Sequence, residues 1–212
     1  MRRPLPYSIA LLLAAAACAP RAVPPNERPP RRTATVLVYN VHAGADARGA
    51  DNLARVAALV REIDADVALL QEVDRGVRRS RGVDQPAALA RLTGRHVAFG
   101  KTLDYQGGDY GIAILSRWPI RRDTLVRLPV EPPQERSGTY EPRGALVATL
   151  DAPGGPLVVV NTHIDASRDD RWRRQEIRAV VALARALGAD GTPLLVDGAR
   201  PSEPGRAVHD SP

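Results

Sequence analysis

The chain has 212 residues, of which 44% are hydrophobic and 4% aromatic, and this length is enough for one domain with a mostly aliphatic core. Residues 1–32 contain six arginines and one glutamate, a balance of +5, which leaves only +1 of the total net charge of +6 for the rest of the chain. The part expected to fold therefore has little of the excess positive charge with which proteins hold nucleic acid tightly.

The first predicted element is an export signal. Arg2 and Arg3 precede an apolar stretch, residues 9–17, that is too short to span a bilayer. Small residues then lead to Cys18, the only cysteine, in a pattern that resembles the lipobox of bacterial lipoproteins, although Ala15 stands where leucine is more usual. We therefore expect a signal peptide with a lipobox at residues 1–18 and lipidation of Cys18. The protein would then be exported and anchored to a membrane of the bacterial cell envelope. The alternative is a plain secretory signal and a secreted or periplasmic protein.

A Pro/Arg-rich segment follows at residues 19–32, and its composition predicts an extended tether. We expect one domain from residue 33 to residue 212. With a single cysteine in the chain, no intramolecular disulfide is possible.

Strands and helices alternate along this domain. Strands are predicted where apolar, β-branched residues run together, and helices where apolar residues recur every three or four positions. In chain order we predict a strand at 35–39, a helix at 51–63, a strand at 66–70, a short helix at 85–92, strands at 97–99, 111–115, 124–128, 145–150 and 157–161, a helix at 168–187 and a strand at 193–196. This order favours a layered α/β sandwich, in which two sheets pack face to face with helices outside.

Polar residues stand directly before or after several of these predicted strands. Asn40 follows the first strand, Glu72 follows the second, and His163 follows the strand at 157–161, while Arg143 precedes another. Gathered at one edge of the sandwich, the carboxylate and amide would suit Mg²⁺ or Mn²⁺. The arginine would bind a phosphate ester, and the histidine would donate or accept a proton.

Five segments, in this order, resemble those of the endonuclease/exonuclease/phosphatase superfamily, which has the deoxyribonuclease I-like fold. They are VLVYNVHAG, DVALLQEVD, DYGIAILSRWPI, PRGALVATL and VVVNTHID, and RDDRWRRQ at the start of the last helix is also similar. The resemblance implies two packed mixed sheets with outer helices. It also implies metal-dependent hydrolysis of a phosphate ester, with nucleic acids, lipid headgroups and small phosphoesters as the substrate classes.

The resemblance also implies roles for single residues. Glu72 would be the main metal carboxylate, and Asn40 its neighbour at the metal or the phosphate. His163 would contact the scissile phosphate, and Arg143 would act as an oxyanion or structural partner. Each residue has a plainer alternative: a solvated carboxylate for Glu72, a turn residue for Asn40, a satisfied strand-end histidine for His163, and a partner of Glu141 for Arg143. We expect Asp109 and Tyr110 to serve strand packing, His42 to lie at the rim, and Asp165 to hold the loop after His163.

The sequence departs from the family near its end. The family has Gly-Asp-x-Asn after the last helix and strand, and here Asp197 is followed by Gly198 and Ala199, so Asp197 would replace the family aspartate only in part. The family's later Ser-Asp-His motif has no counterpart, and we interpret His209-Asp210 as a chance match. We therefore expect an incomplete domain that lacks its last strands and an impaired activity. A non-catalytic envelope binding module or a degenerate pseudoenzyme is the alternative.

Overall fold

The computed structural model describes residues 33–131, 141–166 and 170–199. The predicted signal peptide, Cys18, the tether and His209-Asp210 lie outside these ranges. In the described part, no helix has both the length and the apolar character needed to cross a membrane.

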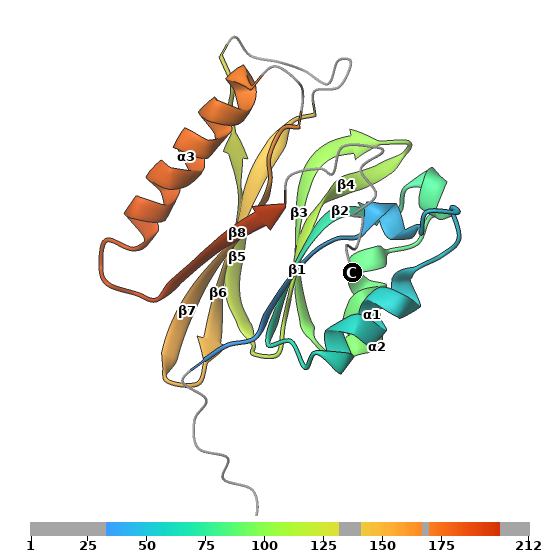
Figure 1. Ribbon diagram of the computed structural model, residues 1–212, viewed down its shortest axis with the longest axis horizontal. Helices are drawn as coiled ribbons and strands as arrows, with labels where there is room; N and C mark the ends of the chain where they lie inside the picture. Colours follow the sequence, from blue (N-terminus) through green and yellow to red (C-terminus); the bar gives the residue numbers. More distant parts are fainter. Residues whose placement is uncertain (1–32, 132–140, 167–169, 200–212) are drawn as a thin grey trace, which may run out of the picture.

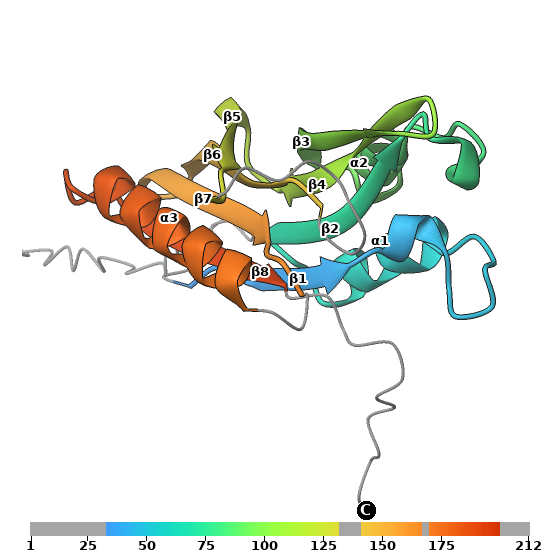
Figure 2. The same cartoon turned by 90° about the horizontal axis from the view of Figure 1, so that it is seen from above.

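Eight strands form two four-stranded sheets that pack against each other (Figures 1 and 2). The first sheet has the order β1-β2-β4-β3 and the second the order β5-β6-β7-β8. Each sheet is mixed, because its pairs are antiparallel except for β1 with β2 in the first and β7 with β8 in the second. The strands are β1 Val36–Asn40, β2 Val67–Arg75, β3 His96–Tyr105, β4 Gly108–Ser116, β5 Ile120–Leu128, β6 Arg143–Ala152, β7 Gly155–His163 and β8 Leu194–Ala199.

The helices cover the two outer faces. Helices α1 (Leu53–Glu62) and α2 (Gln85–Thr93) lie against the first sheet, and α3 (Arg171–Leu187) lies against the second (Figure 1). Two short 3-10 helices, η1 (His42–Gly44) and η2 (Arg78–Ser80), follow β1 and β2. The four layers confirm the predicted α/β sandwich with outer helices.

The core is divided into layers by the alternation of side chains along each strand. Between the sheets, aliphatic residues such as Leu69, Ile114 and Leu146 are fully buried. Beneath the helices, alternate residues of the same strands, such as Leu70 and Ala113, face the other way and pack against α1 and α2. Because side chains alternate in this way, the position of a residue in its strand decides whether it faces the other sheet or a helix.

The boundaries differ from the sequence predictions chiefly in β2. We predicted that this strand ends at Leu70, with polar residues after it, but it continues to Arg75. An irregularity between Leu70 and Val73 allows this continuation, because it changes the register without ending the pairing with β4. The strand predicted at 97–99 is likewise longer, and β3 also has a register shift, between Lys101 and Leu103.

Candidate active site

Asn40 and His163 are each the last residue of a strand, and the two strands belong to different sheets. Val36 and Val38 pack between the sheets, so Asn40, two residues further along β1, faces the same way. In β7, Leu157 and Val159 also pack between the sheets, so Asn161 and His163, at the next alternate positions, face the same way. Both predicted residues therefore point into the space between the sheets at one edge of the sandwich.

Glu72 reaches this space through the irregularity in β2. Leu70 pairs with Ala113 and Val73 with Gly111, so two residues of β2, Gln71 and Glu72, stand opposite one residue of β4. Leu70 and Val73 both pack on the helix side, which leaves the two residues between them for the other face. The φ of Glu72 is 57°, in the left-handed region, and this strained conformation belongs to the bulge.

The three residues contact one another at a single oxygen atom. The Nδ2 group of Asn40 donates to Oε1 of Glu72 at 2.8 Å, and Nε2 of His163 lies 3.4 Å from the same atom. Asn40 is itself oriented by the backbone N–H of His42, which donates to Asn40 Oδ1 at 2.9 Å. His42 is exposed, at the rim of the site.

The carboxyl group of Glu72 is ionised at neutral pH. Burial acts to raise its pKa, but the hydrogen bonds from His163 and Asn40, with the charges of His163 and His42, outweigh burial and lower the pKa from 4.5 to about 2. A fixed negative charge therefore stands at the edge where the sheets meet.

A buried amide pair behind the site joins the two sheets. Gln71 Nε2 donates to Asn161 Oδ1 at 2.8 Å, and Asn161 Nδ2 donates to the backbone oxygens of Leu70 at 3.0 Å and Ala113 at 2.8 Å. Both amide side chains are completely buried. They fix β7, and with it His163, against the bulge that presents Glu72.

Arg143 lies close to this edge but on the helix side of its sheet. It pairs with Leu128, which packs beneath α3, and it is 6% exposed. Its Nη1 lies 3.4 Å from Glu141 Oε2, and among the described residues its Nε has no hydrogen-bond partner. From the sequence, pairing with Glu141 is the simpler role for Arg143, and this contact is present. The Nε group of Arg143 could still donate a hydrogen bond to an anion.

Asp165 and Glu176 form a contact that the sequence predicted only in part. The backbone N–H of Asp165 donates to Glu176 Oε2 at 2.7 Å, and both residues are fully buried. The expected role of Asp165 in the loop after His163 agrees with this position. The sequence did not predict a buried Glu176, because a glutamate in an arginine-rich helix is usually exposed to solvent. The only signal was the apolar periodicity of the helix, which indicates the face that packs on the sheet.

Tyr110 is buried in β4, in agreement with the expected role in strand packing, whereas Asp109 makes ion pairs that were not predicted. Asp109 Oδ2 accepts a hydrogen bond from Arg75 at 2.5 Å, and its Oδ1 lies 2.9 Å from the ammonium of Lys101. Tyr110 is 6% exposed, and burial, followed by the negative charge of Glu72, raises the pKa of its phenol strongly. Its hydroxyl therefore stays neutral near the candidate site.

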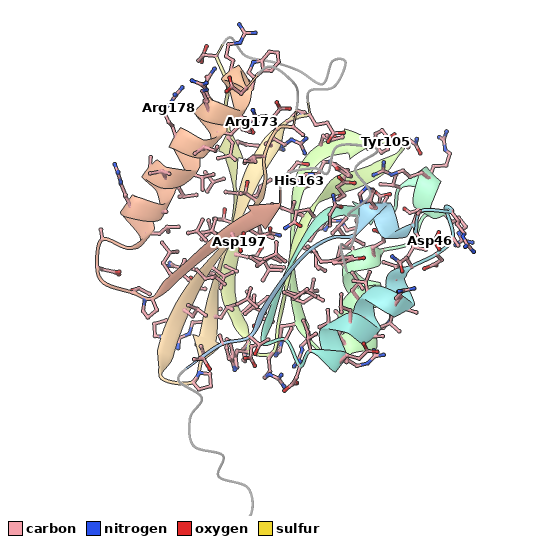
Figure 3. The ribbon with its side chains drawn as sticks, in the orientation of Figure 1. Asp46, Tyr105, His163, Arg173, Arg178 and Asp197 are labelled. Carbon is pink, nitrogen blue, oxygen red and sulfur yellow. The ribbon has the colours of Figure 1, made fainter. Side chains whose placement is uncertain are left out.

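Asp197 lies toward the same edge of the sandwich as Asn40 and His163. Within the described part of the chain, no hydrogen bond or ion pair joins it to Asn40, Glu72 or His163. Asp197, labelled on β8 in Figure 3, pairs with Asn161 in the register of β7 and β8, so its side chain faces the space between the sheets. Its side chain is exposed, and its contact in the described part of the chain is local, with the N–H of Gly198 donating to Oδ1 at 2.6 Å. The stretch after Ala199 lies outside the described residues.

One carboxylate oxygen at the site is available to a hard divalent cation. Asn40 and His163 both approach Oε1 of Glu72, which leaves Oε2 available within the described part of the chain. That part contains no group of three or more His, Cys, Asp or Glu side chains able to hold a metal ion. Mg²⁺ is commonly held by one or two carboxylates and keeps several waters, so the ionised carboxylate of Glu72 is a suitable ligand for it.

Comparisons with known proteins address the fold and the family of this chain. A search of curated proteins gives no match. Among solved structures, an endonuclease/exonuclease/phosphatase from Beutenbergia cavernae is 28% identical, with a TM-score of 0.57 over 70% of this chain and 43% of its own. A mannosyl-6-phosphatase from Bacteroides thetaiotaomicron is 20% identical, with a TM-score of 0.62 over 78% of this chain and 64% of its own. The human Nocturnin catalytic domain, with a bound sulfate anion, is 20% identical, with a TM-score of 0.57 over 77% and 62%.

The chain thus spans 43–64% of the length of these structures, and the two that are 20% identical show the fold alone. The family model described as the Endonuclease/Exonuclease/phosphatase family matches residues 37–196, which include Asn40, Glu72, Arg143 and His163. This chain belongs to the endonuclease/exonuclease/phosphatase family.

Proposed function

We propose that this protein hydrolyses a phosphate ester with the help of Mg²⁺ or Mn²⁺. The observation that carries the proposal is the ionised Glu72, held by Asn40 and His163 where the two sheets meet. Membership of a family of endonucleases, exonucleases and phosphatases supports hydrolysis at phosphorus as the reaction class.

Each residue then has a distinct task. Glu72 would hold the divalent ion, and Asn40 orients its carboxylate through the hydrogen bond to Oε1. When bound, the ion supplies Lewis-acid chemistry and neutralises the charge that develops on phosphate oxygens. His163, whose Nε2 lies 3.4 Å from Glu72 Oε1, would give a proton to the oxygen that leaves the ester, and Arg143 would contribute a buried positive charge near this edge. Asp197, which faces the same space from β8, would orient the attacking water and so replace the family aspartate in part.

The proposed substrate is a phosphate ester from one of three classes: a nucleic acid, a lipid headgroup or a small phosphoester. Because the residues from Thr33 onward carry a net charge of only +1, a small ester or a headgroup is favoured over a long polyanion. The mannosyl-6-phosphatase of B. thetaiotaomicron is a structural neighbour whose name indicates a small phosphoester.

We propose a reduced rate for this chain. Gly198 and Ala199 follow Asp197, and neither provides the side-chain amide that the family has nearby. Loss of one member of a catalytic unit generally lowers the rate by orders of magnitude. A non-catalytic binding module remains the alternative function, and the experiment below separates the two.

Envelope anchoring is a further proposal, based on the sequence around Cys18. Cells that express the full chain and are fed labelled palmitate should incorporate label into the protein, and Cys18→Ala should abolish this incorporation. A Ser8→Ala variant serves as the control within the same segment. Equal labelling of the wild type and Cys18→Ala would contradict lipidation at this residue.

The function is tested with the full chain and with p-nitrophenyl phosphate and bis(p-nitrophenyl) phosphate as substrates. Hydrolysis should require Mg²⁺, stop with EDTA, and fall by roughly a hundredfold or more in Glu72→Gln, which removes the charge with little change in size. The control is Glu62→Gln, an exposed residue of α1. Binding of phosphate without any turnover would contradict the enzyme and favour the binding module.

A further inference from the structure

A pocket of about 520 Å³ opens between the segments that follow β1 and β2. Its walls come from the segment between η1 and α1 and from the segment between η2 and α2. Asp46, in the first of these segments, lies on the side of the molecule where α1 and α2 are (Figure 3). Asn40, Glu72 and His163 do not line the pocket, and the proposed hydrolysis does not use it.

Hydrogen bonds hold the pocket and the active site in a fixed relation. Ala43 lines the pocket directly after His42, whose N–H orients Asn40. Gln85 Nε2 donates to the backbone oxygen of Ala43 at 2.6 Å, and Gln85 Oε1 accepts from the N–H of Asp74 at 2.9 Å. Asp74 lies two residues after Glu72, roughly 7 Å along the strand. Ala43 follows Asn40 by three residues, so the wall of the pocket lies within about 10 Å of Asn40 along the chain.

The charged residues at the pocket cancel in pairs. Arg79 lines the pocket and makes two hydrogen bonds of 2.9 Å to the fully buried carboxylate of Asp74, and its guanidinium lies 4.6 Å from the centre of the Tyr105 ring. Arg81 Nη2 lies 3.4 Å from Asp51 Oδ2, and this pair is exposed at the rim. Two positive and two negative charges leave no net charge, yet hydrogen-bond donors and an acceptor remain at the pocket.

The other residues that line the pocket argue against a nucleobase, a second phosphate or an acyl chain as its ligand. Five lining residues between positions 43 and 50 are alanine or glycine, which leaves space rather than a shaped apolar wall. Among the described residues that line the pocket none is aromatic, so a nucleobase has no ring on which to stack. A second phosphate would need an uncompensated positive charge, and an acyl chain would need larger apolar side chains than Leu53 and Val83 provide.

We propose that this pocket binds an uncharged, polyhydroxylated part of the substrate, such as a sugar ring, while the phosphate lies at Glu72 and His163. This inference rests on the proposed function and narrows its substrate class to polyol phosphates. The volume lies in the range of small-molecule sites. The donors of Arg79 and Arg81 and the acceptor of Asp51 would bind hydroxyl groups.

The test compares two ligands by calorimetry on the full chain with Mg²⁺. Inorganic phosphate reports the active site alone, and glucose 6-phosphate reports the active site together with the pocket. The wild type should bind glucose 6-phosphate at least about tenfold more tightly than phosphate. Ala50→Trp, which fills the pocket, should abolish this advantage and leave phosphate affinity unchanged. Ala47→Trp is the matched control, because Ala47 is exposed in the same loop but does not line the pocket.

A second variant keeps the test decisive if Ala50→Trp does not fold. Arg81→Ala should weaken glucose 6-phosphate several-fold, while Arg78→Ala, an exposed arginine that does not line the pocket, should not. An equal affinity for both ligands overturns the sugar pocket and leaves the proposed function standing. An advantage for adenosine 5′-monophosphate without one for glucose 6-phosphate also overturns it. Failure to bind either phosphate or glucose 6-phosphate overturns the proposed function as well.

Discussion

Glu72 combines a strained backbone with an ionised side chain. A non-glycine residue in the left-handed region costs on the order of 1–3 kcal/mol, and such strain persists only where surrounding contacts impose it. Three contacts impose this conformation on Glu72. They are the hydrogen bond from Asn40, the proximity of His163, and the pairing of β2 with β4 on both sides of the bulge. The strain is the cost of turning two consecutive residues, Gln71 and Glu72, toward the same face.

Asn161 is the residue whose loss should damage the fold most directly. Asn161→Ala removes the hydrogen bonds to Gln71 and to two backbone oxygens and leaves buried polar groups without partners. We expect a loss of roughly 2–4 kcal/mol in the free energy of unfolding, measured by urea denaturation.

The matched control for this prediction is Asn52→Ala at the start of α1, where the asparagine side chain makes no capping hydrogen bond. It should change stability by no more than about 0.5 kcal/mol. Equal effects of the two substitutions would contradict the role of Asn161 in joining the sheets.

At the residue scale, the sequence predicted that Asn40, Glu72 and His163 gather at one edge, because polar residues after apolar strands are conspicuous. It did not predict how Glu72 gets there. A bulge depends on pairing with β4, nearly forty positions further on, and nothing local to residues 70–73 indicates it. The hydrogen bond between Gln71 and Asn161 was not predicted for the same reason, since the two residues are distant in sequence.

At the scale of elements, α3 supports the loop after His163 through Glu176. Burial raises the pKa of this carboxyl to about 7, against the opposing hydrogen bond from Asp165 and the charge of Arg143. The folded state therefore keeps a proton that the unfolded chain releases near pH 4.5. The stability that this group contributes is fully present below that pH and is lost as the pH rises toward 7.

Glu176→Gln tests this linkage, because glutamine can still accept the hydrogen bond from Asp165 and has no proton to lose. The variant should exceed the wild type in stability at pH 8 by roughly 1–3 kcal/mol, with little difference at pH 4.5. Denaturant melts at several pH values measure this, with Glu62→Gln as the exposed control. A difference that does not change between pH 4.5 and pH 8 would contradict the raised pKa.

The elements themselves were largely predictable, for identifiable reasons. Strong apolar runs such as residues 157–160 locate β7, and the periodicity of residues 172–187 locates α3. The ends were less predictable where pairing extends a strand beyond its apolar run, as in β2 and β3. In both cases a polar segment continues as a strand because its backbone pairs with β4.

At the scale of the molecule, two strand–helix–strand units place the site. In β1-α1-β2 and in β7-α3-β8 the paired strands are parallel, so their carboxyl ends lie at the same edge of each sheet. Packing the sheets face to face brings these two edges together, and Asn40 and Glu72 come from one unit while His163 and Asp197 come from the other. The site is therefore a product of the whole sandwich and not of any single motif.

The central claim is that Glu72 and His163 form one hydrolytic unit, and a double-mutant cycle on turnover tests it most directly. Hydrolysis of bis(p-nitrophenyl) phosphate with Mg²⁺ would be measured for the wild type, Glu72→Gln, His163→Gln and the double variant. Residues that act as a unit are strongly non-additive. We predict that the double variant is about as slow as the slower single variant. Losses that multiply, or a Glu72→Gln variant as active as the wild type, would contradict the account.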